Sequence, residues 1–212
     1  MRVVITAGGL SEPIDSFRAI TNHSTGRLGS VIAEEFLARG DEVVYICSSS
    51  ALRPSTHCPT IIANTAREVK SVVEDVLLNQ SIEVFVHSMA VSDFEVESIS
   101  PELVDGKMPS DAEHPCVILR QTPKIIDLLK KISPKTRVVG FKLLKNVPEE
   151  KLLEIAAALC SRADCEFVVA NLLEEIGADF HVARLVDRDS SVLERCGTKN
   201  EIAQAILKVL LS

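Results

Sequence analysis

The stretch "RVVITAGG" at residues 2–9 decides how the rest of the chain is interpreted. "RVVIT" is a short run of mostly β-branched residues, which is typical of a buried parallel strand, and two glycines follow it. The first clear helix pattern begins only at residue 27, within "TNHSTGRLG" (21–29), which contains two further glycines, Gly26 and Gly29. A long insert, "AGGLSEPIDSFRAI", therefore separates the strand from its helix, and the chain has a glycine turn on either side of that insert.

Strand and helix patterns alternate along the remaining sequence. Strands are predicted over residues 2–6, 41–47, 83–91, 137–143 and 166–171, with a late pair at 181–187 and 191–196, and helices over residues 27–39, 65–79, 124–132, 149–160 and 198–212. This alternation predicts an α/β fold with a doubly wound, mainly parallel, Rossmann-like sheet and helices on both faces. We expect a single domain over residues 1–212. Ligands of such sheets bind beyond the carboxyl ends of the strands.

One segment does not follow this alternation. Residues 92–121 are polar and contain several Pro and Gly residues before they end in the apolar run "CVIL". Segments of this length within a compact domain are usually functional or mobile. We therefore predict a flap over about 92–121 that is partly a β-hairpin.

The composition narrows the possible partners. A formal net charge of -7 and a pI near 5.3 argue against nucleic acid as a main partner. No apolar run is long enough to cross a bilayer, and the N-terminus lacks the pattern of a signal peptide. We therefore expect a cytoplasmic protein without a membrane partner. The six cysteines form no CxxC pair, and with the scattered histidines they predict no fixed metal site.

The two glycine turns are candidates for binding phosphate. Gly8 and Gly9 would allow the backbone to approach an anion closely, and "STGRLG" places free N–H groups at a helix start. Each turn on its own could equally be an ordinary strand exit or helix start. Because the first strand leads into one turn and the first helix begins at the other, we expect both to converge on one crevice, which favours phosphate binding.

Several motifs are absent. The sequence contains neither GxGxxG nor GxxxxGK[ST], so the dinucleotide fingerprint and the P-loop are missing. The only tyrosine, Tyr45, lies in a predicted strand without a lysine four residues later, which argues against a short-chain dehydrogenase. An NAD(P)-dependent Rossmann-like reductase and a non-catalytic nucleotide-binding or regulatory protein remain the alternatives to an enzyme that uses a nucleoside triphosphate.

Taken together, these stretches resemble the phosphopantothenate–cysteine ligase family. "ITAGG.SEPIDSFRAITNHSTGRLG" resembles its N-terminal signature, "SMAVSDF" its alanine–aspartate loop and "GKMPS" its flap lysine motif. "TPKII", "VVGFKL" and "FVVAN" match later segments in order, so the resemblance covers about residues 2–171 and continues more weakly to the end.

The resemblance implies a reaction of coenzyme A biosynthesis. CTP, favoured over ATP and accompanied by Mg²⁺, would activate 4'-phosphopantothenate to an acyl-cytidylate and release pyrophosphate. Cysteine would then displace CMP and form 4'-phosphopantothenoylcysteine. The resemblance further implies a free-standing bacterial-type ligase without flavin. Its expected partners are a second copy in a homodimer, with active sites near the interface, and a separate decarboxylase that acts on the product.

The resemblance also assigns roles to individual positions. Asn22 would hold the activated carboxyl group, and Lys107 on the flap would stabilise negative charge, which makes these two the catalytic candidates. Arg18 would reach the substrate phosphate in the neighbouring subunit. The positions implied to bind the acid are Arg18, Asn22, Ala90 and Asp93, and those implied to bind the nucleotide are Gly8, Gly9, Ser24, Gly26, Gly29, Asp93, Lys107, Phe141 and Asn171.

This sequence departs from the family pattern in three places. Leu10 follows the double glycine where a threonine is usual, and the flap has a single lysine. The segment "EIAAALCSRADC" before "EFVVAN" lacks the lysines of many bacterial members. These departures bear on the choice between CTP and ATP.

Overall fold

The computed structural model describes residues 1–212 and is built on one eight-stranded sheet. The strands of this sheet are β1 (Arg2–Ala7), β4 (Glu42–Cys47), β5 (Thr60–Ile62), β6 (Val84–His87), β9 (Arg137–Leu144), β10 (Phe167–Leu172), β11 (Ala183–Val186) and β12 (Val192–Cys196). They lie in the order β12-β11-β10-β9-β6-β1-β4-β5. The predicted strands are confirmed. The sheet also contains β5, which the sequence analysis did not predict.

The six strands from β5 to β10 are parallel, and β11 and β12 are antiparallel additions at one edge. Taken in chain order, the parallel strands follow the doubly wound sequence 3-2-1-4-5-6. The direction of winding reverses between β1 and β6. A ligand crevice is expected at such a reversal, beyond the carboxyl ends of the strands.

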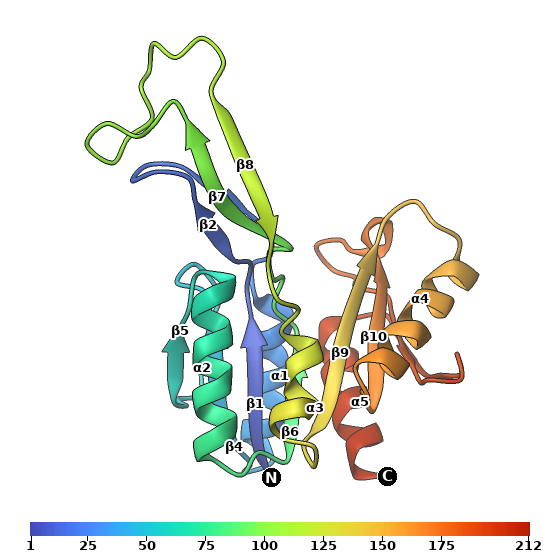
Figure 1. The fold of residues 1–212 in the computed structure, drawn as a ribbon. Helices are drawn as coiled ribbons and strands as arrows, with labels where there is room; N and C mark the ends of the chain where they lie inside the picture. Colours follow the sequence, from blue (N-terminus) through green and yellow to red (C-terminus); the bar gives the residue numbers. More distant parts are fainter.

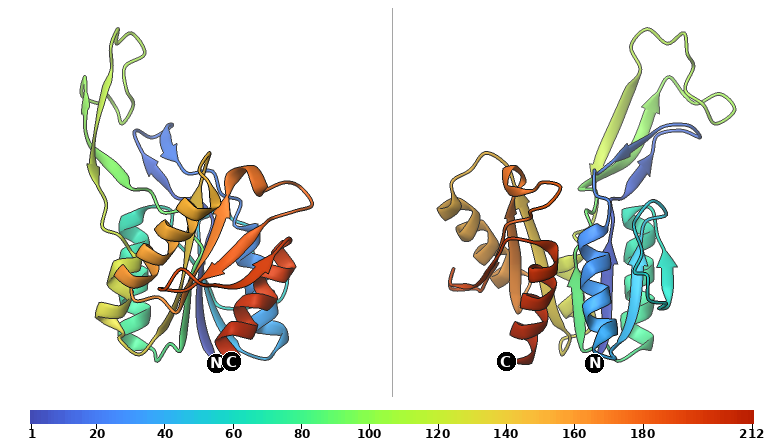
Figure 2. Two further views of the ribbon diagram at one scale, coloured as in Figure 1. Left: turned by 90° about the vertical axis from the view of Figure 1, so that its right-hand side faces the viewer. Right: turned by 180° about the vertical axis from the view of Figure 1, so that it is seen from behind.

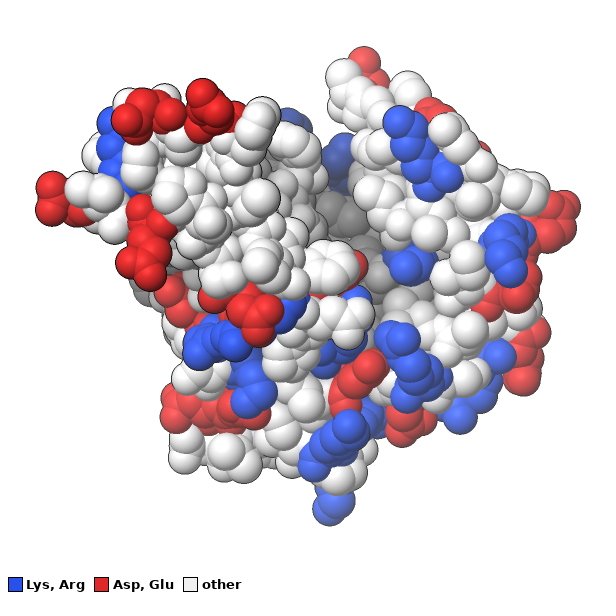
Figure 3. Space-filling view, turned by 45° about the horizontal axis from the view of Figure 1, so that its top comes forward, with Lys and Arg blue, Asp and Glu red and all other residues white.

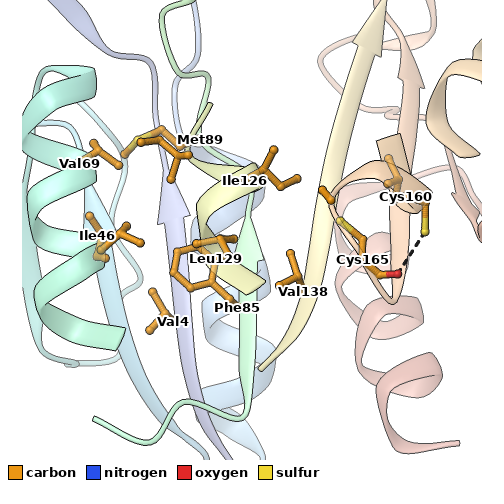
Figure 4. Close-up of a cluster of buried hydrophobic side chains, with 14 of the residues drawn as sticks. Val4, Ile46, Val69, Phe85, Met89, Ile126, Leu129, Val138, Cys160 and Cys165 are labelled. Carbon is orange, nitrogen blue, oxygen red and sulfur yellow. Dashed lines mark hydrogen bonds between the residues drawn. The ribbon is translucent and has the colours of Figure 1, made fainter. Parts of the chain in front are cut away.

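Helices cover both faces of the sheet (Figures 1 and 2), as predicted. On one face lie α1 (Arg27–Ala38) and α5 (Lys199–Leu211), and on the other lie α2 (Ala66–Asn79), α3 (Ile126–Ile132) and α4 (Glu149–Arg162). Each face has its own apolar core. Figure 4 shows the core on the face covered by α2, α3 and α4. It contains Val4, Phe85 and Val138 of the strands, Val69 of α2 and Leu129 of α3.

The cysteines mostly belong to these cores. Cys160 lies in the last turn of α4, and Cys165 lies three residues beyond the end of that helix. The Cys160 thiol contacts the Cys165 carbonyl at 3.2 Å. Burial raises the pKa of Cys160 to about 11 and that of Cys165 to about 12, so both remain protonated thiols near neutral pH. Five of the six cysteines are buried, whereas Cys116 on the flap is exposed.

Two hairpins rise above the carboxyl edge of the sheet (Figure 1). The insert after β1 forms a hairpin of β2 (Ser11–Pro13) and β3 (Ala19–Thr21), which was not predicted from the sequence. Its base is anchored by Glu12, whose carboxylate accepts a hydrogen bond of 2.7 Å from the backbone N–H of Ala66 at the start of α2. The flap is the second hairpin, formed by β7 (Phe94–Ser100) and β8 (Cys116–Gln121), as predicted.

None of the helices has the length and apolar character that a bilayer crossing requires.

Candidate functional site

The two glycine turns meet, as the sequence predicted. A Cβ atom added to Gly26 would lie 3.2 Å from the backbone nitrogen of Gly8 and 2.9 Å from the Cβ of Ala51. The N–H of Gly9 donates to the carbonyl of Ser24 at 3.2 Å. Gly8 and Gly26 both have positive φ angles, of 90° and 72°, which other residues adopt only with strain. Glycine is therefore required both for the backbone conformation and for the close approach of the two segments.

Asn22 lies at the base of the first hairpin, beside these turns. A Cβ at Gly9 would overlap the carbonyl oxygen of Asn22, so only glycine permits this crossing. The Asn22 backbone N–H donates to Leu10 at 3.1 Å, and its side-chain amide donates to the carbonyl of Val91 at 3.1 Å. The side chain thus links the insert after β1 to the segment that follows β6, at the reversal point of the sheet.

The segment after β6 forms the opposite wall. Ala90 donates to the carbonyl of Gly8 at 2.8 Å and accepts from the N–H of Leu10 at 3.1 Å, so strand pairing continues past the ends of β1 and β6. Asp93 further along pairs with Lys124. Lys124, within "TPKII", was not among the site residues predicted from the sequence. The signal for it was a cation placed just before a helix and after the flap.

The start of α1 differs from the starts of α2 and α5. Thr65 and Thr198 cap α2 and α5, each accepting from the N–H of a glutamate three residues later, at 3.2 Å. Helix α1 begins at Gly26 with no side-chain cap and no acidic residue in its first turn. Gly29 in that turn lies against β1, because a Cβ there would be 2.5 Å from the Cβ of Ala7. The first N–H groups of α1 and its positive dipole end are consequently left for an anion.

Phe141 and Asn171 lie farther along the same edge. Phe141 on β9 is half-buried against the core that α1 and α5 cover. Asn171 on β10 is buried and donates from its side-chain amide to the carbonyl of Val182 at 2.8 Å. In the sheet, β6 separates β1 from β9, and β6 and β9 separate β1 from β10, so Phe141 lies two strands and Asn171 three strands along this edge from Gly8.

Arg18 and Lys107 are not brought to the glycine turns within this chain. Arg18 lies at the tip of the first hairpin, and Lys107 lies on the flap turn that contacts this tip, with its ammonium 5.6 Å from the ring centroid of Phe17. Four residues of extended chain, about 13 Å, separate Arg18 from Asn22 at the hairpin base. Phe17 is 75% exposed. The tip therefore presents an aromatic ring and two cations to solvent.

Asp15 holds this tip together. Its carboxylate accepts from the backbone N–H groups of Phe17 and Arg18 at 2.8 Å and of Met108 at 3.1 Å, and it pairs with the Arg18 guanidinium at 2.9 Å. The hydrogen bonds from Phe17 and Met108 are the main cause of a lowered Asp15 pKa. The hairpin tip and the flap turn thus form one unit through a single carboxylate.

Two buried histidines also lie at the carboxyl edge. His87, the last residue of β6, shares a hydrogen bond of 2.8 Å with the hydroxyl of Thr6. His181 has no hydrogen-bond partner on either ring nitrogen. Burial lowers the pKa of each to about 4, so both imidazoles are neutral near pH 7. Sequence reasoning did not identify them, because nothing in the spacing of the histidines indicates burial.

Figure 3 looks onto this edge from above, and a hollow opens there between two lobes with lysine and arginine side chains on its rim. No group of three or more His, Cys, Asp or Glu side chains is placed to hold a metal ion.

The fold and this edge define the class of the protein as a doubly wound, Rossmann-type α/β protein with glycine turns at the reversal point of its sheet. The chain belongs to the family described as the DNA/pantothenate metabolism flavoprotein C-terminal domain, which it matches over residues 1–212.

Among its curated relatives is the coenzyme A biosynthesis bifunctional protein CoaBC of Thermococcus kodakarensis, 37% identical over 205 residues that cover 97% of this chain and 49% of that protein. The CoaBC protein of Methanocaldococcus jannaschii is 29% identical over 98% of this chain and 49% of its own length. The chain therefore spans about half the length of these relatives.

Solved structures agree over the whole chain. The DNA/pantothenate metabolism flavoprotein from Streptococcus pneumoniae superposes with a TM-score of 0.88 and 34% identity, covering 100% of this chain and 98% of that one. The C-terminal domain of a CoaBC protein superposes with a TM-score of 0.77 and 27% identity, covering 99% of this chain and 95% of that one.

Proposed function

We propose that this chain is a phosphopantothenate–cysteine ligase that uses CTP in preference to ATP. The observation that carries the proposal is the meeting of the two glycine turns beside Asn22, where Gly9 passes the Asn22 carbonyl and the Asn22 side chain bonds to Val91. Family membership and relatives named for coenzyme A biosynthesis support the same reaction. We further propose that the enzyme works in the cytoplasm.

In the first step a carboxylate oxygen of 4'-phosphopantothenate attacks the α-phosphorus of the nucleotide. A new oxygen–phosphorus bond forms, the bond to the β-phosphate breaks, and pyrophosphate leaves. A carboxylate is already a nucleophile, so this step depends on alignment and on neutralised phosphate charge more than on a general base. The uncapped start of α1 and the turns at Gly8 and Gly26 supply backbone N–H groups for that purpose.

In the second step the amine of cysteine attacks the acyl carbon, and CMP leaves as the amine loses a proton. Asn22 is the residue proposed to hold the acyl group through both steps, because an amide can donate to a carbonyl oxygen and accept from an amine. Its present bond to the Val91 carbonyl fixes the side chain at this wall of the crevice. Ala90 and Asp93 would line the pocket for 4'-phosphopantothenate. Phe141 and Asn171 would contact the base and ribose of the nucleotide.

Magnesium fits this scheme only as a companion of the nucleotide. The chain has no cluster of three or more suitable ligands for a resident ion. Mg²⁺ would supply charge neutralisation to the phosphates it arrives with, and the roles above rest on this chain's own groups.

Arg18 and Lys107 are proposed to act as one unit in a homodimer. Asp15 bonds to Arg18 and to the backbone of Met108, next to Lys107, so one carboxylate holds the two cations in the same region. Both cations lie where the flap turn meets the exposed hairpin tip, away from the glycine turns of their own chain. They are therefore better placed to enter the site of a second subunit than to reach their own. Arg18 would there contact the substrate phosphate, and Lys107 would stabilise charge that develops during nucleotide attack.

The central test is a pyrophosphate-release assay with purified protein. We expect release from CTP only when 4'-phosphopantothenate is present, a lower rate with ATP, and 4'-phosphopantothenoylcysteine when cysteine is added. Absence of turnover with every nucleoside triphosphate would refute the ligase proposal. Equal or faster turnover with ATP would refute only the preference for CTP.

A subunit-mixing assay tests the role across the dimer. Arg18→Ala and Asn22→Ala variants, each inactive alone, would be unfolded, mixed in equal amounts and refolded. If Arg18 serves the neighbouring subunit, a symmetric dimer regains about a quarter of its intact sites. No recovered turnover, with refolded wild type as the control, would place Arg18 in its own subunit's site.

A further inference from the structure

Ser48 is the first residue after β4, at the carboxyl edge of the sheet. It is 2% exposed, and its hydroxyl oxygen has no hydrogen-bond partner. Its backbone N–H is satisfied by the carbonyl of Ala7 at 3.3 Å. Buried polar side chains are almost always paired, because an unpaired hydroxyl loses its bonds to water without replacement. The unpaired Ser48 hydroxyl therefore needs an explanation.

The hydroxyl points at the glycine turn after β1. A Cβ at Gly8 would collide with the Ser48 Oγ atom, and it would lie 2.6 Å from the Cβ of Ala51 on the same loop. Ala51 also reaches the second turn, 2.9 Å from the Cβ position of Gly26. The missing side chain of Gly8 thus leaves the Ser48 hydroxyl facing the place where the two glycine turns meet.

That place is also the start of α1. Helix α1 is 12 residues long, its N-cap residue Gly26 has no side chain, and the first helical N–H, that of Arg27, makes only a long contact of 3.4 Å to the Thr25 hydroxyl. Its first-turn N–H groups and the positive end of its dipole favour an anion. A serine hydroxyl adds one further donor, and a phosphoryl group with several acceptor oxygens can use backbone and side-chain donors at once.

We propose that the Ser48 hydroxyl donates a hydrogen bond to a phosphoryl group bound at the start of α1. Ser48 and Ala51 then form the third wall of the phosphate site, beside the turns at Gly8 and Gly26. This inference rests on the proposed function for the identity of the ligand. The phosphoryl group belongs either to the nucleotide or to the phosphorylated acid, and both carry the same chemistry.

The test is the variant Ser48→Ala, with Ser49→Ala as the matched control on an exposed neighbour. Calorimetry would measure the binding of CTP and of 4'-phosphopantothenate separately to both variants and to the wild type. We expect Ser48→Ala to weaken one of the two by about tenfold, the size of a lost hydrogen bond to a charged group. The ligand that is weakened identifies the source of the phosphoryl group.

Thermal unfolding distinguishes binding from a structural role. Removal of an unpaired buried hydroxyl should leave the Tm of the free Ser48→Ala protein unchanged or higher. The inference is overturned if Ser48→Ala and wild type bind both ligands equally. It is also overturned if the free energy of unfolding of the free variant falls by as much as its free energy of ligand binding. Ser49→Ala should match the wild type throughout.

Inorganic tripolyphosphate separates this inference from the ligase proposal. If the wild type shows no turnover but tripolyphosphate raises its Tm and this rise is smaller for Ser48→Ala, the phosphate site stands without the ligase. If turnover is normal and Ser48→Ala changes neither ligand's affinity nor the tripolyphosphate shift, the ligase stands and Ser48 is not part of it.

Discussion

The two ends of α1 use the same residue type for different purposes. Gly26 begins the helix with φ 72° and Gly40 follows its end with φ 88°. A Cβ at Gly26 would press on Ala51 and Gly8, whereas a Cβ at Gly40 would meet nothing within 4 Å. Gly40 is an ordinary helix terminator. Gly26 is part of a crowded meeting of loops at the carboxyl edge. A glycine is informative about a site when its surroundings, and not only its φ angle, exclude a side chain.

The largest expected effect comes from exchanging each of these glycines for alanine. Gly26→Ala adds overpacking to left-handed strain and should lower the free energy of unfolding by about 3 kcal/mol while abolishing pyrophosphate release. Gly40→Ala adds strain alone and should cost about 1 kcal/mol with turnover within about twofold of wild type. Urea denaturation and the pyrophosphate assay measure both. Equal effects of the two variants would break the comparison.

The next largest effect concerns the positive charge of Lys107 on the flap turn. Lys107→Gln keeps the length of the side chain but removes its charge, and we expect turnover to fall about 100-fold with unchanged stability. Lys208→Gln, near the lower end of α5 and paired with Glu194, is the control and should keep full turnover. Wild-type turnover in Lys107→Gln would remove this lysine from the mechanism.

A pH series probes the buried histidines of the carboxyl edge. His87 and His181 each have a folded pKa of about 4, below the ordinary value of 6.5. Between these values the unfolded chain binds more protons, so stability is full above pH 6.5 and falls as the pH drops toward 4. Each histidine contributes a slope of up to about 1.4 kcal/mol per pH unit. The stability of His87→Gln, measured by urea denaturation between pH 4 and 6.5, should retain about half of the pH dependence that the two histidines give the wild type. A slope like that of the wild type would contradict the depressed pKa of His87.

The smallest effect compares capped and uncapped helix starts. Thr65 caps α2, so Thr65→Ala should cost about 1 kcal/mol and leave turnover unchanged. Thr25 before α1 accepts only a long contact of 3.4 Å from the N–H of Arg27, so Thr25→Ala should cost less than about 0.5 kcal/mol. Thermal unfolding of both variants checks this order. A larger loss for Thr25→Ala would mean that α1 is capped after all.

The hairpin after β1 shows where sequence reasoning stopped. Its strands have only three residues each, too few for a pattern of alternating burial to be recognised. The hairpin depends on contacts that are distant in sequence, such as Glu12 with Ala66 and Asp15 with Met108. The positions of Arg18 and Lys107 depend on those contacts. Both residues could therefore be predicted from the sequence as site residues, but their closeness in space could not.

The alternation of strands and helices, the doubly wound sheet and the flap could be predicted from the sequence, and both glycine turns could be recognised in it. Those features depend on local periodicity and on backbone freedom, which are properties of short segments. The unpaired Ser48 hydroxyl beside Gly8 and the Asp15 carboxylate that joins the hairpin to the flap became visible only in the three-dimensional structure. Burial and the pairing of polar groups depend on residues far apart in the chain, and no local pattern records them.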